Sequence, residues 1–124
     1  MPKAIATQET QTLQLKSVEG GEITARRLSY GEKLIRRSMT SSMKIEAGKG
    51  KDFAGEMQLI TEQSTAFDFQ KCIVDHNLYK DDEETQKFDL TKLSDIRMLD
   101  PRVGEEIDNW LSELNNFEED EEGN

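Results

Sequence analysis

The segment 100–116 constrains the fold more than any other part of this 124-residue chain. Asp100 followed by Pro101 predicts a helix start, because the carboxylate accepts backbone N–H groups and proline in the first turn loses no hydrogen bond. Helical spacing then puts the apolar residues on one stripe: Val103, Ile107, Trp110, Leu111 and Leu114. Asn115 and Asn116 predict its end. The rest of the chain must therefore supply an apolar surface that covers this stripe.

A β-hairpin is predicted between residues 12 and 28. Apolar and polar residues alternate in both arms, with Leu13 and Leu15 in the first and Ile23 and Ala25 in the second. The Gly20-Gly21 pair between them supplies residues that accept positive φ, as a tight hairpin turn requires. A two-stranded hairpin is barely stable alone, so its apolar side also needs a cover.

A helix is predicted to follow the hairpin, because Ser29 and Glu32 have the spacing of a capping box. Its apolar stripe consists of Ile35, Met39 and Met43, with Leu34 beside them. Its polar flank holds Arg36, Arg37 and Lys44. Three glycines between residues 48 and 55 predict a flexible connection after it.

The longest helix is predicted for residues 53–76. Apolar pairs recur two helical turns apart and form one stripe: Leu59-Ile60, Ala66-Phe67 and Ile73-Val74. Other apolar residues fall outside that stripe: Met57, Phe69 and Cys72. This helix therefore needs more than one neighbour. Residues 80–87 read as a solvated linker, and a short helix around residues 90–96 is expected, with Asp89 or Thr91 as its N-cap.

These elements predict an α+β fold that is mostly helical, with an N-terminal β-hairpin, three or four α-helices and a disordered acidic C-terminal tail. We expect a flexible arm over residues 1–11, one domain over residues 12–116 and the tail over residues 117–124. The tail contains a run of carboxylates that repel one another: Glu118, Glu119, Asp120, Glu121 and Glu122.

The chain is acidic and polar, with a formal net charge of -10 and 34% hydrophobic residues. Residues 1–60 carry ten Lys/Arg and seven Asp/Glu, a net +3, whereas residues 61–124 carry six and nineteen, a net -13. This balance disfavours binding to nucleic acid or anionic membranes, and it suits head-to-tail self-association or a basic partner. The single cysteine forms no intramolecular disulfide, and we expect an intracellular location.

No catalytic constellation is recognisable, so we expect no enzyme activity, cofactor or metal. Cys72 and His76 stand four residues apart, which suggests half a metal site or a thiol–imidazole pair. The alternative is a buried cysteine and a histidine near a helix end. The chain has no second cysteine or histidine to complete a tetrahedral site, so we prefer the alternative.

A short chain with this many apolar helical residues is expected to leave some of them for partners. The candidate partner or self-association surface consists of Phe67, Phe69, Leu78, Tyr79, Trp110, Arg36 and Arg37. For Trp110 and its stripe, the alternative is a position in the core. The basic pairs Arg26-Arg27 and Arg36-Arg37 suit either nearby acids or an acidic partner.

Two stretches resemble the tail assembly chaperones of long-tailed bacteriophages, whose sequences often contain V-R-x-L-(S/T)-x-G-E at a helix start and D-x-x-x-L-D-x-x-x-x-x-E-I near the end. The first matches Ala25-Arg26-Arg27-Leu28-Ser29-Tyr30-Gly31-Glu32, with Ala25 in place of the usual β-branched residue. The second matches Asp95, Leu99, Asp100, Glu106 and Ile107. The resemblance covers about residues 12–115.

This resemblance implies a host-cytoplasmic protein, absent from the mature virion, that coats the apolar helical tape measure protein and helps recruit tail tube protein. Many such chaperones also have a longer form made by ribosomal frameshifting. The acidic tail is then expected to keep the complex soluble, and the uneven charge to favour a salt-sensitive homo-oligomer. The alternatives are an acidic DNA-mimic inhibitor, a structural head–tail or tail subunit, and an adaptor domain.

Overall fold

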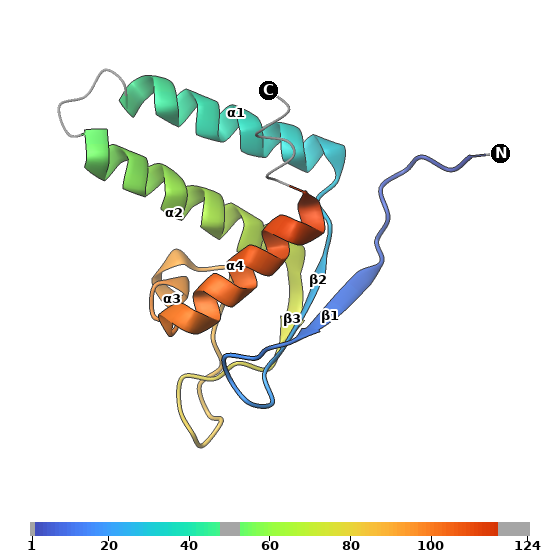
Figure 1. Ribbon diagram of the computed structural model, residues 1–124, viewed down its shortest axis with the longest axis vertical. Helices are drawn as coiled ribbons and strands as arrows, with labels where there is room; N and C mark the ends of the chain where they lie inside the picture. The colour runs from blue at the N-terminus through green and yellow to red at the C-terminus, as the bar shows by residue number, and fades with distance from the viewer. Residues whose placement is uncertain (1, 48–52, 117–124) are drawn as a thin grey trace.

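The computed structural model describes residues 2–47 and 53–116, and it packs helices against one face of a small antiparallel sheet (Figure 1). Three strands form the sheet in the order β1-β2-β3: Thr10–Gln14, Glu22–Arg26 and Ile73–His76. Four helices lie in the described ranges: α1, Tyr30–Ala47; α2, Phe53–Cys72; α3, Leu93–Ile96; and α4, Pro101–Asn115. The predicted α+β class, with its N-terminal hairpin and four helices, is confirmed.

The hairpin forms where the alternation predicts it. Leu13 pairs with Ile23 and Thr12 with Thr24, so apolar and polar pairs alternate between the two faces of the sheet. Gly20 has a φ of 78°, which supports the assignment of the turn. Gly21 is needed for space instead, because a Cβ there would lie 2.6 Å from Cγ1 of Val18.

The third strand contradicts the prediction of a helix up to residue 76. α2 ends at Cys72, and the next four residues pair with β2, which thereby becomes the central strand. Ile73 and Val74 are β-branched and favour a strand, and β2 offered an unpaired edge at this position. Their seven-residue spacing from the earlier apolar pairs imitates a helical stripe. Asn77 closes the sheet, because its Oδ1 accepts the N–H of Glu22 at 2.8 Å.

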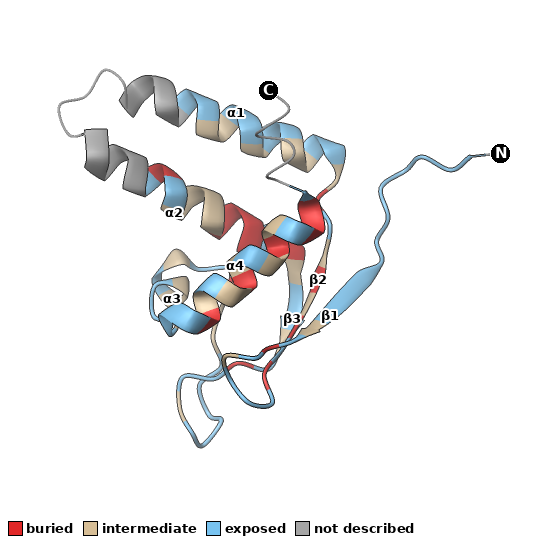
Figure 2. Ribbon diagram, in the orientation of Figure 1, coloured by how far each residue is buried: buried red, intermediate tan, exposed pale blue. Residues whose placement is uncertain are grey.

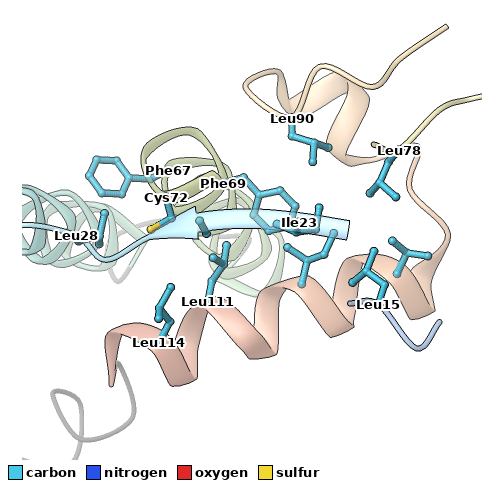
Figure 3. Packing of buried hydrophobic residues seen from close by; sticks show 13 residues of the cluster. Leu15, Ile23, Leu28, Phe67, Phe69, Cys72, Leu78, Leu90, Leu111 and Leu114 are labelled. Carbon is cyan, nitrogen blue, oxygen red and sulfur yellow. The ribbon is translucent and has the colours of Figure 1, made fainter. Parts of the chain in front are cut away.

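The core lies between the sheet, the C-terminal half of α2 and α4, as the buried colour in Figure 2 shows. Figure 3 shows Phe69 of α2, Ile23 of β2 and Leu111 of α4 meeting in it. The residues from Ala66 to Phe69 are all buried, so α2 is covered on every side at this turn. The expectation that this helix needs several neighbours is confirmed.

α4 is capped as predicted. The Asp100 side chain accepts the N–H of Arg102 at 2.9 Å, and Asn116 has left-handed backbone angles at the C-cap. The carboxylate of Glu106 accepts the N–H groups of Lys16 and Ser17 and the hydroxyl of Ser17, at 2.6 to 3.1 Å. α4 is therefore tied directly to the loop that follows β1.

The predicted N-cap of the short helix is wrong. The N-cap of α3 is Lys92, which makes no side-chain capping bond, while Asp89 accepts the N–H of Thr91 before the helix begins. The predicted solvated linker at residues 80–87 is exposed over residues 82–87, and it is folded into a turn because the Asp81 carboxylate accepts the N–H groups of Thr85 and Gln86. The glycine-rich connection at residues 48–52 and the acidic tail lie outside the described residues.

Asn115 joins three elements of the core although it is polar and only 2% exposed. Its Oδ1 accepts the N–H of Leu28 at 2.8 Å, and its Nδ2 donates to the carbonyl of Leu111 at 2.9 Å. Nδ2 also lies 3.6 Å from Sγ of Cys72. The residue that sequence reasoning assigned only to the helix end therefore holds α4, α2 and the β2–α1 connection together.

Asn115→Ala is expected to lower the free energy of unfolding by about 2 kcal/mol, because it leaves the buried N–H of Leu28 without an acceptor. Urea unfolding followed by circular dichroism measures this difference. Asn109→Ala, an exposed change of the same type on the same helix, is the matched control and is expected to be nearly neutral. Equal free energies of unfolding for the two variants would show that the hydrogen bonds of Asn115 do not stabilise the fold.

Candidate functional site

The start of α1 is fixed by a capping box that is joined to an ion pair. The Ser29 hydroxyl accepts the N–H of Glu32 at 3.2 Å, and the Glu32 carboxylate accepts the N–H of Ser29 at 2.9 Å. The same carboxylate receives two hydrogen bonds from the Arg26 guanidinium, at 2.8 and 2.9 Å. These bonds lower the pKa of Glu32 to about 2, with the Arg26 guanidinium as the largest cause. The predicted capping box is confirmed.

The face of α1 that points toward the rest of the protein is largely charged. Arg36 donates two hydrogen bonds to the carboxylate of Asp68 on α2, at 2.8 and 3.2 Å. Lys33 donates from Nζ to the carbonyl of Asn115 at 2.7 Å. Met39, on the same face, is partly buried and packs against the core. Polar contacts therefore fix the rotation of α1 about its axis.

Asp68 is buried at 2% exposure beneath this helix. Burial raises the pKa of its carboxyl to about 6, although Arg36 opposes the shift; the charge of Asp108 on α4 adds to it. Burial also raises the pKa of Asp108. One guanidinium thus lies among two carboxyl groups from different helices, which argues for a structural role because the buried charge is paired and hydrogen-bonded.

The opposite face of α1 leaves apolar side chains in solvent. Tyr30 is 68% exposed, Leu34 44% and Ile35 59%. Figure 2 shows this exposed side of the helix pointing away from α2. Leu34 and Ile35, on the predicted apolar side of this helix, therefore face outward, because the Arg36–Asp68 pair turns Arg36 toward the protein. We call Tyr30, Leu34 and Ile35 the outer face of α1.

The residues of the predicted partner surface are not brought together. Phe67, Phe69 and Leu78 are buried members of the hydrophobic core, so their predicted surface position is wrong. Tyr79 is 37% exposed in the turn after β3, and Trp110 is partly buried against the core. Arg36 is engaged by Asp68, and Arg37 is exposed on α1. The predicted acidic-tail residues, 118–122, lie outside the described ranges.

Cys72 and His76 belong to different elements, so the i, i+4 relation of a continuous helix is lost. Cys72 is fully buried, and burial raises the pKa of its thiol to about 11, which opposes thiolate chemistry. Burial lowers the pKa of His76, whose Nδ1 accepts the N–H of Leu78 at 3.1 Å. Within residues 2–47 and 53–116 no three His, Cys, Asp or Glu side chains group in a way that suits a metal ion.

No family model, curated protein or solved structure matches this chain. None of the helices in the described part of the chain has the length and apolar character needed to cross a membrane.

The outer face of α1 was missed because helical periodicity gives a helix's apolar stripe but not the direction in which it points. One signal was present in the sequence. Lys33, Arg36 and Thr40 follow one another at three- and four-residue spacing, and a lone Asp68 interrupts an otherwise apolar turn of the next helix. A pairing between these two features gives the observed rotation.

The contribution of Asp68 to the free energy of unfolding is expected to fall by about 2 kcal/mol as the pH rises from about 4 to 6. Its pKa is higher in the folded state than the ordinary 3.8, so the folded state binds the proton more tightly, and this advantage disappears above the folded pKa. Urea unfolding at a series of pH values measures it. Asp68→Asn should flatten the profile over this interval, and an unchanged slope would contradict the assignment.

The contribution of Glu32 to stability is expected to have the opposite pH dependence. Its folded pKa is depressed to about 2, so its contribution of about 2 kcal/mol is present above pH 4.5 and lost as the pH falls toward 2. Glu32→Gln should lower stability at pH 7 and remove this part of the acid dependence. Glu83→Gln, an exposed change of the same charge, is the control. If both variants unfold alike at pH 7, the capping pair is not stabilising.

Proposed function

We propose that this protein is a tail assembly chaperone of a long-tailed bacteriophage, which binds the apolar helical tape measure protein and helps recruit tail tube subunits. The observation that carries the proposal is the outer face of α1. Leaving Tyr30, Leu34 and Ile35 in solvent while Lys33 and Arg36 face the protein gives up burial that a protein without a partner would use.

The chemistry of this face suits an apolar helix. Tyr30 and Leu34 lie one helical turn apart, and Ile35 widens the row, so a second helix can pack its own aliphatic ridge against them. Three side chains make a small contact that is weak in a single copy. Many copies along a long helical client would bind it cooperatively through repeated contacts, which fits a chaperone that coats a rod and is later displaced.

The residues that carry the family resemblance have a consistent role in presenting this face. Arg26, Ser29 and Glu32 start α1 and fix its first turn. Asp100 caps α4, and Glu106 ties that helix to the loop after β1. These residues support the proposal because they hold α1 and α4 in the positions that present the outer face.

The arrangement of the carboxylates favours a chaperone over a DNA mimic. A DNA mimic needs a ladder of free carboxylates on ordered elements. Several acidic side chains here accept hydrogen bonds from the protein's own backbone: Asp81, Asp89, Asp95, Asp100 and Glu106. We assign the net charge of -10 to solubility of the client complex, and we place the protein in the cytoplasm of the infected host, absent from the finished virion.

Coexpression with an apolar helical tape measure protein of a long-tailed bacteriophage tests the proposal. The wild-type chain should keep that protein in the supernatant after centrifugation. The triple variant Tyr30→Gln, Leu34→Gln, Ile35→Gln should lower the soluble fraction at least about tenfold, because it removes the apolar contact of the outer face.

A second triple variant, Ile5→Gln, Val74→Thr, Met98→Gln, is the matched control. It removes three exposed apolar side chains from other parts of the surface and should behave as the wild type does. Thermal unfolding of both variants checks that the fold is kept. Equal client solubility with the two triple variants would refute the outer face of α1 as the binding site.

A further inference from the structure

β1 forms an unprotected edge of the sheet. Antiparallel pairs alternate between hydrogen-bonded and non-hydrogen-bonded positions, and the N–H of Leu15 donates to the carbonyl of Gly21 at 2.8 Å in the continued register. Leu13 and Gln11 lie two and four residues before Leu15, so their peptide groups also face β2. Those of Thr10, Thr12 and Gln14 point away from the sheet, and no described residue bonds to them.

The usual devices that block such an edge are missing from β1. Its sequence, TQTLQ, has no charged residue and no proline, and every residue except Leu13 is exposed. The opposite edge differs. After β3 the chain turns back, and the N–H of Phe88 donates to the carbonyl of Leu78, so the residues just after that strand are paired with the segment that follows. The free edge of β1 is available to another strand.

We propose that β1 pairs with β1 of a second copy of this chain, antiparallel about a two-fold axis at Thr12, to join two sheets into one of six strands. In this register Thr12 of one copy faces Thr12 of the other, and Thr10 faces Gln14. Both are pairs whose outward peptide groups exchange hydrogen bonds. Thr12 already shares a 2.9 Å hydroxyl contact with Thr24, so the row of threonines continues across the axis.

The charges at the two ends of the strand are complementary under this symmetry. Glu9 precedes β1 and Lys16 follows it, and both are exposed. The two-fold axis places Glu9 of one copy opposite Leu15 of the other, beside the Lys16 of that copy. A parallel arrangement, or a partner with a uniform charge, would lose this match.

The groove beside β1 offers a further apolar contact. It has a volume of about 640 Å³ and includes Leu13 and Trp110; charges of both signs, Lys16, Arg102, Glu105 and Glu106, lie near the end of β1, and Glu113 lies farther along α4. α4 runs antiparallel to β1 (Figure 1), so the two-fold axis brings Glu113 of one copy toward Lys16 and Arg102 of the other. The apolar side of the groove is then covered by the second Leu13. A second copy therefore fits this surface in backbone and apolar contact, and the match of Glu9 with Lys16 adds the fit in charge.

Cysteine cross-linking of the full-length chain tests the pairing. Thr12→Cys should give a disulfide-linked dimer under mild oxidation, because residue 12 faces itself across the axis within disulfide reach. Thr24→Cys is the matched control: it lies on the same face, one strand farther from the edge, so two copies are roughly 14 Å apart at this position. The native Cys72 is fully buried and does not compete. Equal cross-linking of the two variants, or none, overturns the proposal.

Proline substitution separates backbone pairing from side-chain contacts. Thr12→Pro removes the outward N–H and leaves the bonds between β1 and β2 in place, whereas Thr12→Val keeps that N–H; both remove the hydroxyl contact with Thr24. Sedimentation from about 5 to 500 µM should show a weak dimer for the wild type and Thr12→Val, and a dissociation constant at least about tenfold higher for Thr12→Pro.

A wild type that stays monomeric over this range, or equal dimerisation of the Pro and Val variants, overturns the proposal. If Thr12→Pro does not fold, the cross-linking comparison decides alone. The outer face of α1 contains none of these residues, so a failure of the dimer test leaves the proposed client site untouched, and the reverse also holds.

Discussion

The ion pair between Arg36 and Asp68 is the interaction on which the arrangement of this protein depends. A carboxylate at 2% exposure requires a partner, and Arg36 meets it with two hydrogen bonds. Because Arg36 lies on the side of α1 opposite Leu34, its pairing with Asp68 turns Arg36 inward and leaves Leu34 and Ile35 outward. The apolar surface is thus a consequence of the buried charge: the helix cannot rotate to hide Leu34 and Ile35 without leaving Asp68 unpaired.

α4 provides the second constraint, since it closes the core and is fixed at both ends. Glu106 binds the loop after β1, and Asn115 binds the N–H of Leu28 just before α1. The connection from β2 to α1 is therefore held by the last helix, and Lys33 adds a bond from α1 to the carbonyl of Asn115. Segments nearly ninety residues apart in the sequence set the position from which α1 starts, so the outer face is rigidly presented at its base.

Features set by local chemistry were predictable from the sequence, and those set by distant contacts were not. The capping box at Ser29, the Asp100 cap and the Gly20 turn each depend on a few neighbouring residues, and all were found. β3 was missed because its strand state depends on the free edge of β2, some fifty residues earlier. The buried positions of Phe67 and Phe69 and the outward position of Leu34 depend on how α1, α2 and α4 pack, which periodicity does not encode.

The two proposed contacts divide the surface by chemistry. The outer face of α1 offers side chains and suits a helix, whereas the edge of β1 offers backbone groups and suits a strand. The two contacts use different residues, so one copy can hold a client on α1 and a second copy on β1 at the same time. A two-fold pair would carry two outer faces, and a client that spans both would be released only when both contacts open. Weak single contacts would then give firm but reversible binding, which the proposed displacement of the chaperone by tail tube subunits would need.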